Sequence, residues 1–519
     1  MESNNLRNQI EEIRKALWAK RPIMGEILDT HGNESLYKYS QDFLNVNATP
    51  YLDTRKEELY TVVNDLLKTR LGETIAKNVC DQLRYKPLIS TADHHGIIDN
   101  PYWVNSNIID ALPIPESGDT KLKYSIVFSF ASVSVNNASA YPRGILFHGG
   151  MPDKEEMIRL PFLPDRNKMS VVYNMRGYTK DDIEKAKQQL TQKVKSQEVT
   201  VERAEKIKNI IETFCETDEI LNTPTLVEQI TKINYNMWPH LFHGANGTSE
   251  DSDFKVDLVY LEIETLVTEL LLKQHLFDSS SLIYRLLFEE KFQKAGAEYF
   301  NNLAGSFSTD GNWGTHFFWA VNEKLYRVGL QFDGKNIFST EENISIPFTP
   351  EGISQALREK KIFPNMFLCY LMVAFYYGMK CMGGFSQVND LTMLKINWQK
   401  MLRELGENEE ANAIEPVQTK DLNAGGIVLA YNETESGKLF ASTGIDMMLD
   451  PCDTRFEHFI EFSKQATLLE LMVAMFPTTY SVLYSAPNRN ETLAALSPAE
   501  ILKETGVEAK LRACLENIR

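Results

Sequence analysis

The sequence predicts an α+β protein in which mixed sheets are surrounded by many helices. Residues 1–85 show helical periodicity throughout, whereas short strand-like runs begin at residue 86 and return after residue 313. Of the 519 residues, 43% are hydrophobic, with 27 Phe and 21 Tyr, so the chain can bury a large core. At roughly 150 residues per domain, this length predicts about two to four domains.

The first predicted region, residues 1–85, is helical. Its apolar residues recur three to four positions apart, and Gly72 separates the last two helices. The expected helices are residues 1–20, 35–44, 55–69 and 73–83. The first of them is polar and lacks the apolar core of a signal peptide, so we expect a cytoplasmic protein.

The second predicted region, residues 86–243, is an α+β region. Pro, Gly and Asn turns separate its β-branched and aromatic runs. The expected strands are residues 87–91, 124–135, 144–148, 157–161 and 170–173, with a helix at 101–112. Residues 179–214 form a long charged helix with a thin apolar stripe, which fits a solvated helix packed along one face or an arm that contacts a partner.

The third predicted region, residues 254–519, is again α+β. A loop rich in Gly, Ser and Asp, residues 244–253, marks the boundary, and an apolar helix is expected at 254–276. The expected strands are residues 313–321, 325–332 and 336–339, with a hairpin at 427–442. A buried helix is expected at 364–381; its apolar part is shorter than the ~20 residues of a membrane span, so no such span is expected.

The composition and motifs exclude several classes of function. The chain carries 54 Lys+Arg against 71 Asp+Glu, a net charge of -17, which argues against general nucleic-acid binding. It contains no G-x-x-x-x-G-K-[ST], G-x-G-x-x-G or G-x-S-x-G motif, and therefore predicts no P-loop, dinucleotide fold or serine-hydrolase elbow. We expect a small-molecule substrate; the oligomeric state is left open.

The candidate catalytic residues are Asp93, His94, His95 and Asp99, which lie in one decapeptide directly after the first predicted strand. Two of only nine histidines are adjacent there. Side chains that leave a strand for a Gly turn and a helix reach the sheet edge where α/β active sites commonly lie. Asp93 could accept the second N–H of an imidazole and so orient a general base.

The segment from His94 to Asp99 resembles the HHxxxD pattern of acyltransferases that use coenzyme A or a carrier protein. The family includes nonribosomal-peptide condensation domains and plant-type acyltransferases. The resemblance implies that His95 is the base acting on a hydroxyl or amine, that Asp99 is structural, and that coenzyme A or a carrier brings the acyl donor. Asp310-Gly311-Asn312-Trp313-Gly314 is similar to the D-F-G-W-G loop of plant-type members, departing at two positions, and Asn100 stands where the family has Gly.

Two other functions stay open. Asp93, His94, His95 and Asp99 offer nitrogen and oxygen ligands for a divalent metal, so a metal-dependent hydrolase is one alternative, with any metal unidentified. Adjacent histidines on a strand point to opposite faces, which would leave one of the two for a given metal. The other alternative is a non-catalytic binding or assembly protein whose working surface is the charged helix 179–214.

Five further residues are candidates for substrate binding. Arg143 follows a turn proline and could hold a carboxylate or phosphate bidentately. Trp313 and His316 belong to an aromatic-rich run that could wall a pocket. Asn107 and His148 lie near the decapeptide in sequence. We therefore expect an acyltransferase-like transferase with a histidine base.

Overall fold

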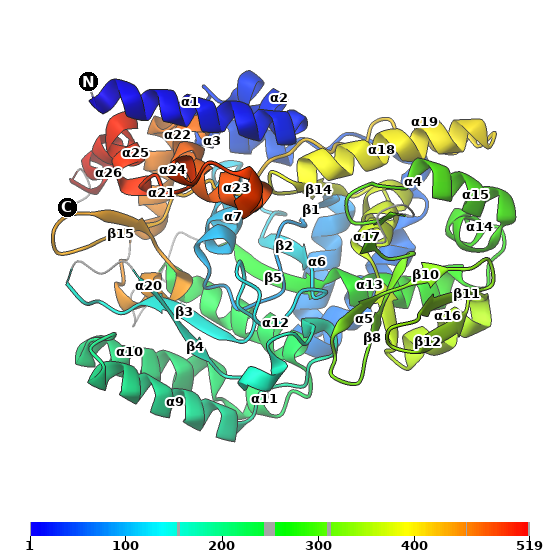
Figure 1. Cartoon of the computed structure of the whole chain (residues 1–519), viewed down its shortest axis with the longest axis horizontal. Helices are drawn as coiled ribbons and strands as arrows, with labels where there is room; N and C mark the ends of the chain where they lie inside the picture. The colour runs from blue at the N-terminus through cyan, green and yellow to red at the C-terminus, as the bar shows by residue number, and fades with distance from the viewer. Residues whose placement is uncertain (1, 153–155, 243–254, 309–312, 453, 517–519) are drawn as a thin grey trace.

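The computed structural model describes residues 2–152, 156–242, 255–308, 313–452 and 454–516. Helix accounts for 55% of the residues and strand for 14%, with several small sheets among many helices (Figure 1). This confirms the predicted α+β class. None of the helices in these ranges combines the length and the apolar character needed to cross a bilayer.

The centre of the molecule is a four-stranded parallel sheet. Its spatial order is β14 (Lys380–Met382), β1 (Leu88–Ser90), β2 (Tyr124–Ser129) and β5 (Asp257–Glu262). The strands come from both predicted α+β regions, so the sheet spans the boundary expected at 244–253, residues that themselves lie outside the described ranges. The chain adds β2 and then β5 on one side of β1 and afterwards places β14 on the other side. The order of the strands therefore reverses between β1 and β14, which is the topological switch point of the sheet.

Helices cover both faces of this sheet. Ile126 and Phe128 of β2 pack into one apolar cluster with α5 (Lys56–Leu71) and α6 (Glu73–Tyr85). Val127, which points the other way, packs into a second cluster with α7 (Pro101–Ala111). Because helices cover both faces, the strands are buried at nearly every position and do not alternate between buried and exposed residues, as expected of a parallel sheet.

The same property explains a wrong prediction. Residues 254–276 were expected to be one apolar helix, but they contain β5, then α13 (Ile263–Leu270) and a π-helical turn, Leu271–His275. A fully buried strand and a buried helix cannot be distinguished by periodicity alone. The buried helix expected at 364–381 is likewise shorter: α17 (Met366–Tyr370) and a π-helical turn, Leu371–Tyr376, lead into strand β14.

Most of the remaining N-terminal helices lie at one end of the molecule, where α1 packs against α23 (Phe476–Leu483). α4 (Pro50–Asp53) lies apart from the others and contacts α5, so the helices at this end are α1 (Glu2–Lys20), α2 (Pro22–His31) and α3 (Leu36–Gln41). The C-terminal segment packs beside them and supplies β15 (Tyr431–Glu433), β16 (Leu439–Ala441), α20 (Gly444–Leu449), α21 (Arg455–Gln465), α22 (Leu468–Val473), α24 (Glu491–Ala494), α25 (Pro498–Thr505) and α26 (Val507–Glu516). Both ends of the chain lie on the same side of the molecule (Figure 1).

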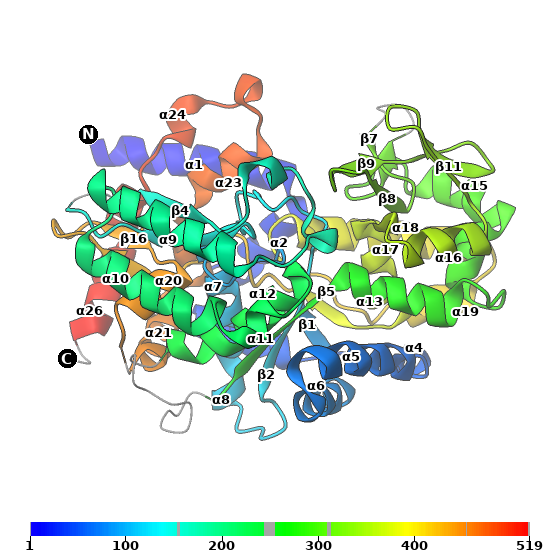
Figure 2. The same ribbon diagram turned by 90° about the horizontal axis from the view of Figure 1, so that it is seen from below.

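The charged segment 179–214 is two helices rather than one. α9 (Lys180–Lys195) and α10 (Val201–Ile210) lie side by side along one edge of the molecule (Figure 2). Most of their apolar residues are buried against the body, where α9 contacts β4 (Met157–Pro161) and α10 contacts α20, whereas Val201 at the start of α10 is exposed. α8 (Pro113–Glu116) follows α7 and precedes β2. Between β2 and β5 the chain also forms β3 (Gly144–His148), α11 (Asp218–Leu221) and α12 (Leu226–Met237).

A lobe of short strands and helices follows β5. Its strands are β6 (Phe307–Ser308), β7 (Trp313–Gly314), β8 (Phe318–Val321), β9 (Arg327–Gly329), β10 (Gln331–Phe332), β11 (Asn336–Ser339), β12 (Ile344–Pro347) and β13 (Ile362–Pro364). Its helices are α14 (Leu282–Phe288), α15 (Glu290–Tyr299), α16 (Pro350–Arg358), α18 (Gln387–Glu404) and α19 (Asn408–Ala413). The lobe lies beside the central sheet, so that β8 and β9 face the end of β2 across a cavity.

An ion pair is buried at the carboxyl end of β5. Glu262 is fully buried and Arg70 of α5 reaches it with both terminal nitrogens. Burial alone would raise the pKa of Glu262, but the Arg70 guanidinium outweighs burial and holds that pKa below its ordinary value. The pair therefore ties α5 to the edge of the sheet that borders the cavity.

We expect Arg70→Met to lower the free energy of unfolding by about 3–5 kcal/mol, because it leaves a buried carboxylate without its counter-charge. Urea denaturation measures the change. The contribution of the pair is present above the ordinary glutamate pKa of 4.5 and is lost as the pH falls below it, since the folded-state pKa is depressed.

Arg84→Met is the matched control. Arg84 also pairs with a glutamate, Glu57, through two nitrogens, but both side chains are solvent-exposed. An exposed pair contributes about 0–1 kcal/mol. Equal losses in the two variants would contradict the role given to the buried pair.

Candidate active site

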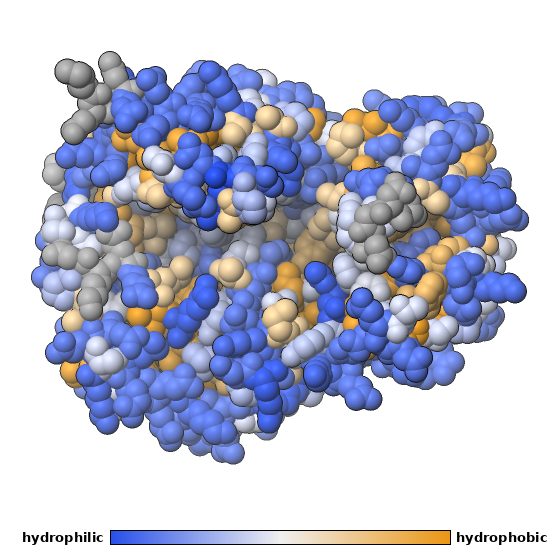
Figure 3. Space-filling view, in the orientation of Figure 1, coloured by the Kyte–Doolittle hydropathy of each residue, from blue (hydrophilic) through white to orange (hydrophobic). Residues whose placement is uncertain are grey.

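A cavity of about 630 Å³ opens at the carboxyl edge of the central sheet. Thr91 follows β1, Ser132 follows β2 and Gly384 follows β14, and all three line it. The cavity thus lies at the switch point between β1 and β14, where ligands bind in open parallel sheets. The face shown in Figure 3 is hollowed near its centre, and hydrophobic residues gather within the hollow.

The segment after β1 continues the ladder with β2 and presents His94 to the cavity. Phe130 N–H donates to the Asp93 carbonyl and His95 N–H donates to the Phe130 carbonyl, each at 2.8 Å. This makes a parallel bridge between His94 and Phe130. In an extended backbone neighbouring side chains point to opposite sides. His94 is half-buried on the cavity wall, whereas His95 is fully buried in the core.

The hydrogen bonds of His94 determine which ring nitrogen is protonated. Asn137 Oδ1 accepts the Ser139 backbone N–H at 3.0 Å, which identifies this atom as the amide oxygen. His94 Nδ1 lies 3.0 Å from the same oxygen and 2.9 Å from Ser139 Oγ. Because Asn137 Oδ1 can only accept, Nδ1 carries the proton. Nε2 then holds the lone pair and has no partner among the described residues.

The surroundings of His94 favour its neutral form. Burial lowers the pKa of the ring, the hydrogen bond that the ring donates to Asn137 raises it, and the nearby Arg327 charge lowers it further. The net pKa lies below the ordinary 6.5. At neutral pH His94 is therefore an unprotonated imidazole with an available basic nitrogen.

His95, the residue expected to be the base, is placed differently. Its Nε2 lies 2.9 Å from the Val227 carbonyl, to which it donates, and its Nδ1 lies 2.7 Å from Ser129 Oγ. The ring is fully buried and does not line the cavity. Both nitrogens are satisfied by neighbouring elements, so His95 packs β1 against β2 and α12.

Asp93 also faces the core. Its carboxylate accepts from Ser106 Oγ at 3.0 Å, from Asn107 Nδ2 at 2.7 Å, and from the Tyr260 hydroxyl. Burial nevertheless raises its pKa to about 6. Asp93 and Asn107 therefore join β1, α7 and β5, and neither orients a histidine.

Asp99, Arg143 and His148 lie away from the cavity in the structure. Asp99 is buried, and one carboxylate oxygen accepts Leu146 N–H at 2.8 Å. Arg143 donates to the Leu163 carbonyl at 2.7 Å and pairs with Asp165. These contacts hold the β3–β4 hairpin in place.

His148 forms a buried pair with a carboxylate. Its Nδ1 lies 2.5 Å from Asp446 Oδ2, and Arg203 of α10 also reaches Asp446, at 3.0 Å. Burial would raise the pKa of Asp446, but His148 and Arg203 bring it to about 2. The group joins β3, α10 and α20 on the side of the molecule away from the lining residues.

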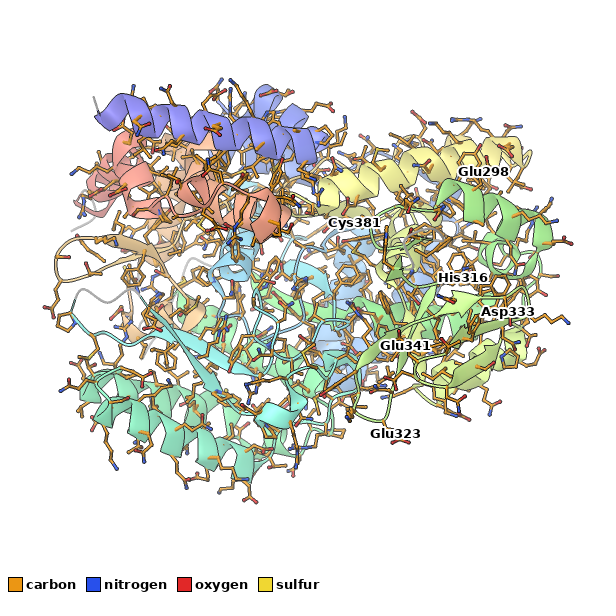
Figure 4. The ribbon with its side chains drawn as sticks, viewed as in Figure 1. Glu298, His316, Glu323, Asp333, Glu341 and Cys381 are labelled. Carbon is orange, nitrogen blue, oxygen red and sulfur yellow. The ribbon has the colours of Figure 1, made fainter. Side chains whose placement is uncertain are left out.

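Of the two aromatic-run candidates, the structure brings one to the cavity. Trp313 lines it and is 46% exposed at its mouth. His316 is instead stacked on Phe332, with ring centroids 4.6 Å apart, and burial lowers its pKa to about 3. Figure 4 shows His316 within the strand-rich lobe, in the same region as Asp333. Of the residues resembling the D-F-G-W-G loop, Asp310, Gly311 and Asn312 lie outside the described ranges.

The cavity walls are largely aromatic and include unpartnered polar atoms. Trp103 lies beside His94, with ring centroids 5.3 Å apart, and Trp319 forms the opposing lobe wall. Trp103 Nε1 and Ser306 Oγ are buried and have no hydrogen-bond partner among the described residues. Buried polar groups are nearly always paired in native proteins, so two orphans in one cavity wall point to a ligand that satisfies them.

Arg327 is the one cation among the described residues that line the cavity, and Asp390 is the one acid. The Arg327 guanidinium lies over the Trp319 ring, 4.3 Å from the centroid, and Nη1 of Arg327 donates to the Ser132 carbonyl at 3.3 Å. Sequence reasoning did not single out Arg327, because 233 positions separate it from His94 along the chain and only the fold brings the two together.

The proposed metal ligands do not converge. Asp93 and His95 face the core, Asp99 lies near β3, and only His94 reaches the cavity. Across the ranges that the structure describes, no group of three or more His, Cys, Asp or Glu side chains is arranged to hold a metal ion. His94 alone would leave a metal without further protein ligands.

A second cavity of about 640 Å³ lies between residues 44–49 and the ends of α5 and α6. Its cations already have partners: Lys56 binds Asp53 at 2.6 Å, Arg84 binds Glu57, and Lys86 donates to the Leu44 carbonyl at 2.7 Å. It lies at the amino end of β1, away from His94. The reactive arrangement is therefore in the cavity at the carboxyl edge.

Comparisons with known proteins add no assignment. No model of a known protein family matches this chain, and no curated protein sequence matches it significantly.

Proposed function

We propose that this protein is an enzyme in which His94 acts as a general base on a small molecule bound in the cavity, with transfer of an acyl group to a hydroxyl or amine as the favoured reaction. The observation that carries the proposal is the fixed tautomer of His94, with Nδ1–H held by Asn137 and the basic Nε2 left for a ligand. The base role expected of His95 thus passes to its neighbour.

The proposed step follows from that geometry. Nε2 of His94 takes the proton from the acceptor O–H or N–H while the acceptor atom attacks the acyl carbonyl. As the tetrahedral intermediate collapses, the carbon–sulfur bond of a thioester donor breaks and the leaving thiolate takes the proton from the imidazolium. Asn137 and Ser139 hold the ring in one orientation throughout, as the third group of a catalytic triad does.

The cavity suits the reacting end of an acyl donor better than its phosphates. Coenzyme A carries several phosphate charges, whereas Arg327 is the one cation among the described lining residues. A coenzyme A or carrier-linked donor would therefore present its thioester to the cavity and keep its phosphates outside. The small-molecule acceptor and the cytoplasmic location stay predictions.

The two alternatives receive less support. A metal-dependent hydrolase needs convergent ligands, which the described residues do not provide. A binding protein working through residues 179–214 remains open, since the outer faces of α9 and α10 are exposed, but a surface of alternating charge is typical of a solvated helix.

We expect His94→Gln to lower kcat/KM by about 10²–10⁴-fold, because a general base contributes on that scale. The measurement is thiol release from short and aromatic acyl-coenzyme A thioesters, each mixed with a panel of primary amines and alcohols. Acceptor-dependent release by the natural protein is the expected positive result.

His458→Gln is the matched control, because His458 is a partly exposed histidine of α21 that does not line the cavity. It should leave the rate unchanged. Thermal unfolding of each variant separates a catalytic loss from a folding defect. A folded His94→Gln protein with the natural rate would refute the proposal.

The pH dependence should report the depressed pKa of His94. The base is active when neutral, so kcat/KM should fall as the pH drops, with its midpoint below the ordinary histidine value of 6.5. Asn137→Asp should move that midpoint to higher pH, because a carboxylate beside Nδ1 stabilises the imidazolium. If the fall of kcat/KM at low pH keeps its midpoint in this variant, a group other than His94 causes that fall.

A further inference from the structure

We infer that the cavity binds a substrate carrying a single carboxylate on an apolar, planar body, and that Arg327 is the residue that selects it. This inference rests on the proposed function, since it takes the same cavity as the substrate site. It adds the chemical class of the substrate and a specificity-determining residue distinct from the base.

The first step is that Arg327 has no counter-charge among the residues that the structure describes. No carboxylate of the described residues lies within ion-pair distance of it, although the chain has 17 more acidic than basic side chains. Glu264 influences Arg327 only by its charge and does not contact it. The two carboxylate oxygens of Glu264 accept hydrogen bonds from Ala131 N–H at 2.9 Å and Ser132 N–H at 2.8 Å. An arginine left free on a cavity wall is available to an anionic ligand.

The second step is that its guanidinium is already oriented. Trp319 supports one face of the group at 4.3 Å, and the Ser132 carbonyl holds Nη1 at 3.3 Å. Two contacts fix the plane and leave the other N–H donors unpaired. A planar fork of donors matches the two oxygens of a carboxylate, and little side-chain freedom is lost on binding.

The third step is the charge count. One guanidinium balances one negative charge, and the other charged residue on the described lining, Asp390, is acidic. A phosphate monoester, with close to two negative charges, would leave an uncompensated charge and be repelled by Asp390. A carboxylate is therefore favoured over a phosphate.

The fourth step is the shape of the walls. Trp103, Trp313 and Trp319 line the cavity, and Trp313 and Val482 are exposed at its mouth, 46% and 69% respectively. Aromatic rings prefer to pack against planar apolar groups. An aryl or arylalkyl carboxylate would satisfy both the rings and the guanidinium.

The test is direct binding, measured by isothermal titration calorimetry and by quenching of tryptophan fluorescence. The probes are benzoate and 3-phenylpropionate, their uncharged amides, and phenyl phosphate. The natural protein should bind the carboxylates with one site per chain and bind the amides and the phosphate at least tenfold more weakly. Arg327→Met should weaken carboxylate binding at least tenfold and leave amide binding unchanged, while Arg327→Lys should keep part of the preference.

Arg159→Met is the matched control: Arg159 is an exposed strand arginine lying over an aromatic ring, Tyr141, but it does not line the cavity. It should bind as the natural protein does. His94→Gln should also keep carboxylate binding while it loses activity. Binding therefore tests the role of Arg327, and activity tests the role of His94 as the base. The inference is overturned if Arg327→Met binds carboxylates like the natural protein, if amides or phenyl phosphate bind as tightly, or if no carboxylate binds at millimolar concentration.

Discussion

The site depends on one short backbone pairing, the parallel bridge that joins the segment after β1 to the end of β2 through Phe130. Two hydrogen bonds of 2.8 Å keep this segment extended for a few residues past the regular strand. Extension forces neighbouring side chains apart, so one histidine enters the core and the other reaches the cavity. A helical turn at the same place would have set the two side chains only about 100° apart, instead of on opposite sides.

For one histidine to lie in the core, the polar groups buried there must all have hydrogen-bond partners. His95 and Asp93 are polar groups in an apolar interior, where each donor or acceptor left without a hydrogen-bond partner would cost about 1–3 kcal/mol. Ser129, Val227, Tyr260 and their neighbours supply the partners. The buried polar network fixes the direction of the β1 extension, and with it the place where His94 emerges. The position of the His94 ring in the cavity is thus set by core residues that do not themselves line the cavity.

Sequence reasoning singled out a decapeptide that reaches the cavity, but it assigned the base to His95, whereas the ring that lines the cavity is that of His94. The pattern of strand, Gly turn and helix was enough to place residues 91–100 at a sheet edge, and the adjacent-histidine argument already implied opposite orientations. Which ring faces inward depends on the register with β2, and no local signal encodes that register. The buried strand at 257–262 was missed for a related reason: its apolar run carries no period, so only its partner β2 reveals it as a strand.

The cavity would allow an acidic protein to hold the proposed carboxylate. A net charge of -17 would oppose the approach of a carboxylate from solution. At physiological ionic strength, however, charges separated by more than about 8 Å are largely screened, whereas a contact in a partly enclosed, aromatic-walled site is not. The charges inside the cavity then determine whether an anion binds. Among the described residues, Arg327 is not paired with an acid, and Glu264 accepts hydrogen bonds from two backbone amides. Its positive charge also disfavours protonation of His94, so the residue that would hold the substrate helps to keep the base unprotonated.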